Sequence, residues 1–312
     1  HVLSRRQRQM CIRDRSAFAQ KKKITSEELK PSDLSGLEFR SVGPAFMSGR
    51  IADIAINPEN ENEWYVAVGS GGVWKTVNSG TTWKPIADNE SFYSTGCITI
   101  DPHNTSKVWL GTGENVGGRH VGIGHGVYVS ENGGKSWKSM GLKSSEHISK
   151  IIVSPKDPNI VFVASQGPLW SSGGDRGLFK TNDGGKTWKN VLSVNEWTGV
   201  TDIVIDQLNP DILYAATWQR HRNVASYMGG GPGTSIYKST DHGKNWIEIK
   251  DGLPNSNLGK IGLAISPFDS TILYAAVETD RRNGAVYKTT NSGGSWLKTV
   301  SYTHLRAHET EE

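Results

Sequence analysis

TNDGGKTW at residues 181–188 decides the fold, because the same eight-residue pattern occurs five times along the chain. The pattern is Thr/Ser, any residue, Asp/Asn, any residue, Gly, any residue, Thr/Ser/Asn and Trp. We call each copy a box; the others are TVNSGTTW (76–83), SENGGKSW (130–137), STDHGKNW (239–246) and TTNSGGSW (289–296). The box tryptophans recur about every 50 residues, a period that is typical of a repeat array or a propeller.

The composition of the box predicts a tight turn that ends in a buried ring. The Asp or Asn at the third position can accept backbone N–H groups across a turn, and the glycine at the fifth position can take a positive φ. Burial of one indole removes about 150–250 Å² from water, of order 4–6 kcal/mol as an upper bound. A turn hydrogen bond contributes about 1 kcal/mol. We therefore expect all five box tryptophans to be largely buried.

The rest of each repeat predicts three more strands. An alternating apolar segment comes first, at residues 51–57, 96–101, 149–154, 201–206 and 260–266. A short apolar segment follows, at 63–68, 107–112, 160–165, 212–217 and 272–277. A third strand enters the box and a fourth leaves it, and four strands per period make one propeller blade. The sequence predicts an all-β propeller over residues 38–299, with about five four-stranded blades.

The two ends of the chain do not follow this pattern. Residues 1–15 and 300–312 resemble translated sequencing-adapter read-through, so we interpret them as non-native segments. Residues 16–37 are interpreted as a signal-peptide remnant and linker, because Ala17 and Ala19 form a small-x-small cleavage pattern. This predicts a secreted, periplasmic or cell-surface bacterial protein. No run of 18 apolar residues is present, so no membrane span is expected in this fragment.

The ends also carry the positive charge of the chain. Residues 1–23 hold eight basic residues and one acidic residue, and residues 301–312 hold one Arg and three Glu. The remaining 26 basic and 27 acidic residues are nearly balanced. This balance argues against a nucleic-acid partner.

The loops between the second and third strands are the candidate binding region, since long loops on a rigid scaffold commonly carry function. These loops, at 113–126, 165–177, 217–234 and 278–284, contain six of the eight arginines of residues 24–300 and none of its lysines. Arginine offers a planar fork for carboxylate, phosphate or sugar oxygens. The predicted ligand-binding residues are Glu114, Arg119, His120, Trp170, Arg176, Trp218, Arg220, Arg222, Arg281 and Arg282.

Two alternatives remain open for these loops. The arginines could instead brace neighbouring loops through Glu114, Asp175, Glu278 and Asp280. His120, His125 and His221 could suggest a metal, but no ligand spacing there matches a closed site, so we expect no metal and no cofactor. In a four-stranded meander consecutive turns fall on opposite ends, so these loops should lie opposite the boxes.

The five boxes resemble the Asp-box (BNR) repeat, over about residues 38–299. The opening SVGPAFMSGRIADIAINPENENEWYVAVGSGGVWKTVNSGTTW, residues 41–83, is similar to the sortilin-type propeller family and its bacterial glycosyl hydrolase-like relatives. The resemblance implies a propeller of seven to ten blades, of which this chain would be an incomplete part. It also implies a binding module that recognises a peptide, a protein or a glycan.

A glycoside hydrolase is the alternative that the same resemblance offers. Xyloglucanase-type enzymes share such propellers and carry a catalytic Asp in a T-D-x-G-G-x-Y-like motif. The matching segment here is VGSGGVW, residues 68–74, with Gly69 at the Asp position. Glycoside hydrolysis typically needs two carboxylates, so Glu114 with Asp175 or Glu196 is the remaining candidate pair. Sialidases carry an R-I-P motif, of which Gly49–Ala52 is a partial match. The absent Asp and the Arg-rich loops favour binding over hydrolysis, with a purely structural role as a third possibility.

Overall fold

The computed structural model describes residue 36, residues 50–279 and residues 284–301. The chain divides into two units, residues 1–47 and 48–312. Gly36, an exposed turn residue, is all that is described of the first unit. The segments interpreted as non-native and as a signal-peptide remnant, residues 1–15 and 16–37, therefore lie almost entirely outside the described residues, as do residues 302–312. Everything below concerns the second unit.

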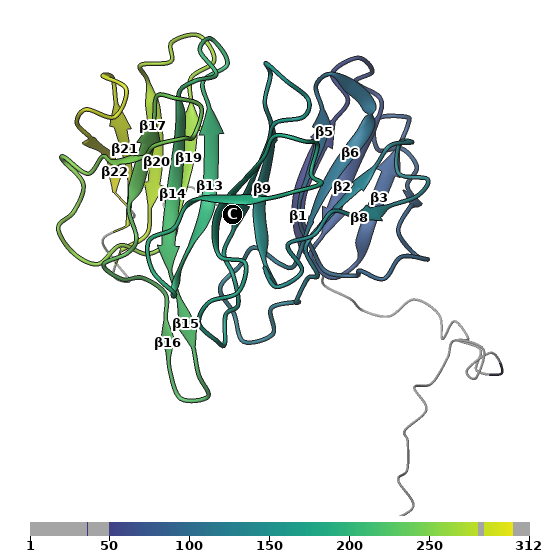
Figure 1. The fold of residues 1–312 in the computed structure, drawn as a ribbon, viewed down its shortest axis with the longest axis horizontal. Helices are drawn as coiled ribbons and strands as arrows, with labels where there is room; N and C mark the ends of the chain where they lie inside the picture. The colour runs from purple at the N-terminus through teal and green to yellow at the C-terminus, as the bar shows by residue number, and fades with distance from the viewer. Residues whose placement is uncertain (1–35, 37–49, 280–283, 302–312) are drawn as a thin grey trace, which may run out of the picture. The chain divides into compact units, whose positions relative to one another are not determined.

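Five four-stranded antiparallel sheets make up this unit (Figure 1). The sheets are β1 (Ile51–Ile56), β2 (Trp64–Val68), β3 (Gly72–Thr76) and β4 (Lys84–Pro85); β5 (Thr95–Asp101), β6 (Asn104–Thr112), β7 (Val127–Ser130) and β8 (Lys138–Ser139); β9 (Ile148–Val153), β10 (Val161–Ser165), β11 (Gly177–Thr181) and β12 (Lys189–Leu192); β13 (Thr198–Ile205), β14 (Leu213–Gln219), β17 (Ile236–Ser239) and β18 (Ile247–Glu248); and β19 (Ile261–Ile265), β20 (Leu273–Val277), β21 (Ala285–Thr289) and β22 (Leu297–Ser301). Strands β15 (His221–Arg222) and β16 (Tyr227–Met228) form a separate hairpin between β14 and β17. The predicted all-β fold of four-stranded blades is confirmed.

The first strands of successive sheets lie side by side: β1 contacts β5, β5 contacts β9, β9 contacts β13, and β13 contacts β19. At every step a polar side chain bonds the main chain of the neighbouring first strand. These bonds join Asp53 to Ile98 N (3.1 Å), Thr99 to Ile151 O (2.9 Å), Ser149 to Val200 O (3.1 Å) and Asp202 to Leu263 N (2.8 Å). Side chains alternate across a strand, so each sheet also buries apolar residues against both neighbours. Four apolar clusters, each shared by two consecutive sheets, form the core.

Each box closes a turn by the same two hydrogen bonds, which main-chain N–H groups donate to side-chain oxygens. In the third box, Gly185 N donates to Thr181 Oγ1 (3.0 Å) and Thr187 N donates to Asp183 Oδ1 (2.9 Å). Gly185 has φ +89°, a conformation that disfavours a side chain. Hydrogen bonds from Thr187 and Thr181 hold the pKa of Asp183 well below its usual value. The turn chemistry predicted from the sequence is confirmed.

The box tryptophans are buried to different degrees. The Trp296 side chain is only 2% exposed, whereas Trp83 is 39% exposed and the other three are half-buried. The expectation that all five are largely buried is therefore wrong, most clearly at Trp83. The rings pack onto the preceding sheet, as the bonds from Trp137 Nε1 to Ile86 O and from Trp188 Nε1 to Met140 O show. Within the described residues no sheet precedes the one that holds Trp83.

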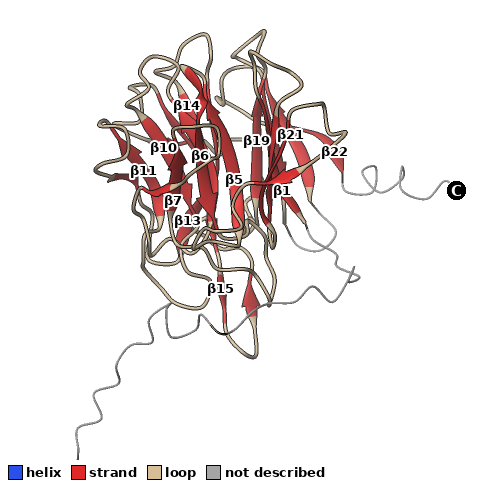
Figure 2. Ribbon diagram, turned by 90° about the vertical axis from the view of Figure 1, so that its right-hand side faces the viewer, coloured by secondary structure: helices blue, strands red, loops and turns tan. Residues whose placement is uncertain are grey.

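The boxes and the variable loops lie at opposite ends of the sheets. In the first sheet β2 and β3 pair from Trp64 with Thr76, beside the box, to Val68 with Gly72, beside the loop. The box main chain bonds the turn between the first and second strands of its own sheet, for example Gly184 N to Asn159 O (3.0 Å). We call the two ends the box end and the loop end. Figure 2 shows the hairpin that contains β15 extending from the loop end.

Candidate functional site

The β15–β16 hairpin carries an exposed aromatic ring, Tyr227, at the loop end. The Arg222 guanidinium lies 4.4 Å from the centre of the Tyr227 ring. Arg222 N also donates to Leu169 O (3.0 Å), so the hairpin is fixed to the loop that holds Trp170. Trp170 is 47% exposed and Tyr227 is 38% exposed. Flat exposed rings beside hydrogen-bonding groups are suited to stacking on a sugar or on a peptide side chain.

Arg220, which was predicted to contact ligand, is fully buried. Its Nη1 donates to Val116 O and its Nη2 to Gly167 O, both at 3.3 Å. Its guanidinium lies 5.0 Å from the centre of the Trp218 ring, which is buried as well. Burial lowers the pKa of Arg220 to about 9. Arg220 thus connects three variable loops from three sheets, beneath the exposed surface.

Arg176 has a similar position and role. It is buried, and it donates to Gln166 O (2.8 Å), Ser171 O (3.1 Å) and Pro168 O. Burial lowers the pKa of its guanidinium to about 10. Neither Arg176 nor Arg220 forms an ion pair with a described residue. These two arginines brace the loops as one of the alternatives predicted, but through main-chain carbonyl groups instead of carboxylates.

The other predicted residues are spread over the loop end. Arg119 and His120 are exposed in the loop between β6 and β7. Arg281 and Arg282 lie outside the described residues. The structure therefore brings Arg176, Trp218 and Arg220 together in a buried layer.

Lys260 and His147 belong to this layer and were missed from the sequence. Lys260 Nζ donates to Asn115 O (2.8 Å) and Asn115 Oδ1 (2.9 Å), and burial together with the charge of Arg220 lowers its pKa to about 8. His147 Nδ1 donates to Glu114 O (3.0 Å), and burial first, then the charge of Arg220, lowers its pKa to about 3. Both residues directly precede the first strand of a sheet, His147 before β9 and Lys260 before β19. A fourth-to-first connection must also reach the loop end, and that topological signal could have identified them.

Glu114 lies in a small cavity of about 260 Å³ beside Arg50 and Gly69. Arg50 Nη2 lies 2.5 Å from Glu114 Oε1, and Gly122 N donates to Glu114 Oε2 (2.7 Å). A Cβ atom on Gly69 would lie 2.6 Å from Glu114 Oε1, so Glu114 fills the space that a side chain at position 69 would need. Glu114 is the one carboxylate that lines this cavity within the described residues.

A second cavity, of about 240 Å³, opens between the first strands of the sheets. It shares Ala52 and Asn115 with the first cavity. Lys150, Asp202 and Lys260 contribute charges of both signs, and burial raises the pKa of Asp202. The two cavities therefore adjoin, and the second contains both acidic and basic side chains.

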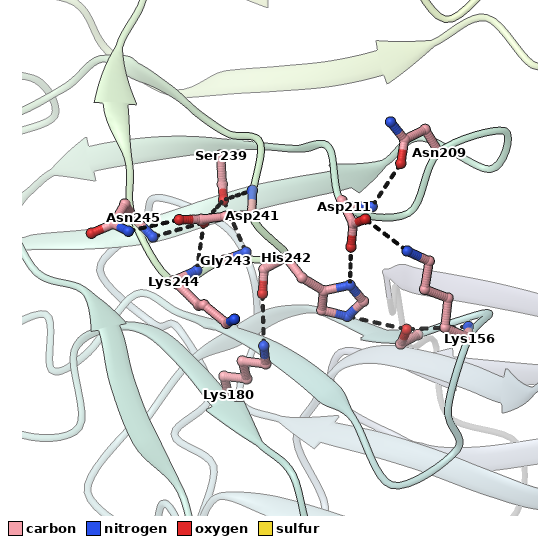
Figure 3. Close-up of polar contacts among 11 residues, drawn as sticks. Lys156, Lys180, Asn209, Asp211, Ser239, Asp241, His242, Gly243, Lys244 and Asn245 are labelled. Atoms are coloured by element: carbon pink, nitrogen blue, oxygen red, sulfur yellow. Dashed lines mark hydrogen bonds and ion pairs between the residues drawn. The ribbon is translucent and has the colours of Figure 1, made fainter.

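At the box end, Ser154, His242 and Asp211 are connected by hydrogen bonds in the manner of a Ser-His-Asp triad. Figure 3 labels His242 and Asp211 of this group. His242 Nδ1 lies 3.2 Å from Asp211 Oδ1, and His242 Nε2 lies 3.3 Å from Ser154 Oγ. Ser154 is fully buried, and its Oγ accepts a hydrogen bond from Lys156 N (3.3 Å). A nucleophile needs access to its substrate. The group is therefore a polar joint between two sheets, and it too was missed from the sequence.

Within residues 50–279 and 284–301, no group of three or more His, Cys, Asp or Glu side chains could hold a metal ion. No helix of that part of the chain is long and apolar enough to cross a membrane.

No family model matches the chain, but several curated xyloglucanases are similar to it in sequence. A probable oligoxyloglucan-reducing end-specific xyloglucanase from Neosartorya fischeri is 24% identical over 232 residues, covering 68% of this chain and 25% of that protein. Xyloglucanase Xgh74A from Acetivibrio thermocellus is 26% identical over 228 residues, covering 63% of this chain and 25% of that protein. The chain thus spans about a quarter of the length of these curated relatives.

Solved structures support the fold. An ancestral GH74 enzyme superposes with a TM-score of 0.63 at 24% identity, over 80% of this chain and 31% of that one. YCF48 bound to D1 peptide superposes with a TM-score of 0.52 at 17% identity, over 84% of this chain and 71% of that one. The chain has an all-β fold of β-propeller type, and it is similar in sequence to GH74 xyloglucanases.

Proposed function

We propose that this chain forms part of a β-propeller that binds a polysaccharide on its loop end. The observation that carries the proposal is the exposed pair of Trp170 and Tyr227 on loops that are held in place by the buried Arg176 and Arg220. Aromatic faces stack on the apolar faces of sugar rings, and a rigid platform loses little conformational freedom on binding. The similarity to xyloglucanases supports a glycan as the ligand class.

The proposal includes binding without hydrolysis by the described residues. Gly69 has no side chain to transfer a proton, and Glu114 is paired with Arg50. Hydrolysis by either common mechanism needs an acid and a second carboxylate that flank the glycosidic bond. The cavity beside Glu114 contains one carboxylate from the described residues.

Two finer assignments support the same proposal. The closed turns of the five boxes are consistent with the Asp-box repeat, and the opening segment is consistent with the sortilin-type propellers and their glycosyl hydrolase-like relatives. The Ala17 and Ala19 pattern supports export, where a polysaccharide would be met.

The test compares xyloglucan, an unbranched β-glucan and a panel of unrelated peptides by isothermal titration calorimetry. We expect saturable binding to a glucan and no release of reducing ends during prolonged incubation. Binding to peptides but to no glycan would overturn the ligand class. Steady release of reducing ends, abolished by Glu114→Gln, would overturn binding without hydrolysis and support the hydrolase.

A further inference from the structure

The first strands of two middle sheets, β9 and β13, share a pattern of half-buried residues. In β9 these residues are Lys150 and Ile152, and in β13 they are Asp202 and Val204. Lys150 and Asp202 hold equivalent positions, each opposite an alanine of the second strand. Side chains two positions apart in a strand point to the same face. Each strand therefore presents a charged residue and then a β-branched apolar residue on one face.

The apolar residues of this pattern line a cavity of about 430 Å³. Its walls include Ile152, Val204 and Ile265 of three first strands, and Pro102, Pro155 and Pro267 of the turns that follow first strands. Those turns lie at the box end. The volume falls within the range of about 300–1,000 Å³ that is usual for small-molecule sites.

The residues at the centre of this cavity belong to sheets that have a described neighbour on both sides. Strand β9 contacts β5 and β13, and β13 contacts β9 and β19 (Figure 1). Ile152 and Val204 each pack against an apolar cluster that two sheets share. The face that they turn to the cavity is therefore set by sheets within residues 95–301.

Lys150 lines both this cavity and the polar cavity of about 240 Å³ described above. It thus stands where an apolar space meets a polar one. No described residue accepts a hydrogen bond from Lys150 Nζ, and none forms an ion pair with it. The other lysine of the polar cavity, Lys260, is already bonded to Asn115.

The acidic residues that line the two cavities are held by main-chain N–H groups. Asp202 accepts from Ile203 N (2.9 Å) and Leu263 N (2.8 Å). Asp53 accepts from Ile54 N and Ile98 N, and Asp206, which is buried, accepts from the two residues that begin its turn. Burial raises the pKa of Asp202, so the surroundings of Lys150 are partly desolvated.

We propose that the 430 Å³ cavity binds a small carboxylate with an apolar tail, a ligand class separate from a polysaccharide. The carboxylate accepts a hydrogen bond from Lys150 Nζ, and the tail lies along Ile152 and Val204 towards the prolines of the box end. A charge-assisted hydrogen bond and the burial of apolar surface both stabilise such a complex. The site lies between the first strands, apart from the exposed rings of Trp170 and Tyr227.

Isothermal titration calorimetry of the 312-residue chain tests the proposal with decanoate, decanol and butyrate, each below its aggregation concentration. We expect decanoate to bind one site per chain with a Kd below about 1 mM. Decanol lacks the charge and butyrate lacks most of the tail, so each should bind at least about tenfold more weakly.

Lys150→Met removes the ammonium group and keeps most of the side chain. It should weaken decanoate binding about tenfold and leave decanol binding unchanged. Lys189→Met changes an exposed lysine of the fourth strand β12 and should bind decanoate like the wild type. Near-ultraviolet circular dichroism checks that each variant is folded.

Val204→Thr is the second variant, because it keeps the shape of the side chain and places a hydroxyl group in the apolar wall. We expect it to weaken decanoate and decanol alike. The proposal is overturned if decanoate shows no saturable binding up to about 1 mM, or if Lys150→Met binds decanoate as tightly as Lys189→Met does. Butyrate that binds as tightly as decanoate would remove the apolar tail from the proposal.

Discussion

Lys238 and Lys288 occupy the same position in successive sheets: Lys238 Nζ donates to Ser292 in the next sheet, whereas no described residue accepts a hydrogen bond from Lys288 Nζ. We expect Lys238→Met to destabilise the fold and Lys288→Met to leave the monomer unchanged. Lys238 Nζ donates to Ser292 O at 2.9 Å, and a hydrogen bond from a charged group contributes about 1.5–3 kcal/mol. Two effects reduce this figure. Burial lowers the pKa of Lys238, which shows that its charge is partly desolvated, and Tyr214 Oη also donates to Ser292 O (3.2 Å).

The expected loss for Lys238→Met is therefore about 1–2 kcal/mol of unfolding free energy. Methionine keeps most of the side chain over the Tyr214 ring, so the change reports on the ammonium group. For Lys288→Met the expected change is within about 0.5 kcal/mol, since no described acceptor is lost. Urea unfolding at a concentration where the chain is monomeric measures both values. Equal losses for the two variants would refute the reasoning, because the hydrogen bond to the next sheet, and not the lysine itself, is expected to stabilise the fold.

Three further predictions concern the loop end. The pKa of His147 falls from an ordinary 6.5 to about 3 on folding, so at low pH the unfolded chain takes up a proton that the folded chain excludes. The free energy of unfolding should therefore decline as the pH falls from about 6.5 towards 3, by at most about 1.4 kcal/mol per pH unit. In urea unfolding, His147→Gln should show a flatter dependence of stability on pH than the exposed-site control His120→Gln. Arg220→Met leaves Val116 O and Gly167 O without their donor, so we expect a loss of about 2 kcal/mol and faster limited proteolysis of the loops at 113–126 and 166–176; an increase in stability would contradict the bracing role. Trp170→Ala should weaken glycan binding on the order of tenfold without shifting the urea midpoint, and unchanged affinity by calorimetry would remove Trp170 from the binding surface.

The sheets could be predicted from the sequence because their signals are local. The hydroxyl, Asx and glycine positions of each box form a turn within eight residues, and alternating apolar segments specify the strands around it. Antiparallel connectivity then separates the boxes from the variable loops. No property of a distant residue is needed for any of these steps.

Burial at the loop end could not be predicted in the same way. Arg220 resembles a solvent-exposed loop arginine in the sequence, but its depth depends on Val116 and Gly167, which come from two other sheets. The same holds for Trp83, whose exposure depends on whether a sheet covers it. Ser154 and His242 are 88 positions apart and meet only because neighbouring sheets place their box-end turns together.

In three places a lysine directly before one box donates from Nζ to a main-chain carbonyl of the next box, and this contact has a consequence for how such a chain can change over generations. The lysine binds a main-chain carbonyl, so the receiving residue can be Gly133, His242 or Ser292 without loss of the acceptor. Where the lysine is present, the contact therefore places little constraint on the identity of the receiving residue. Duplication, deletion or exchange of one whole repeat creates compatible junctions at once, while the loops at the other end remain free to diverge towards new ligands.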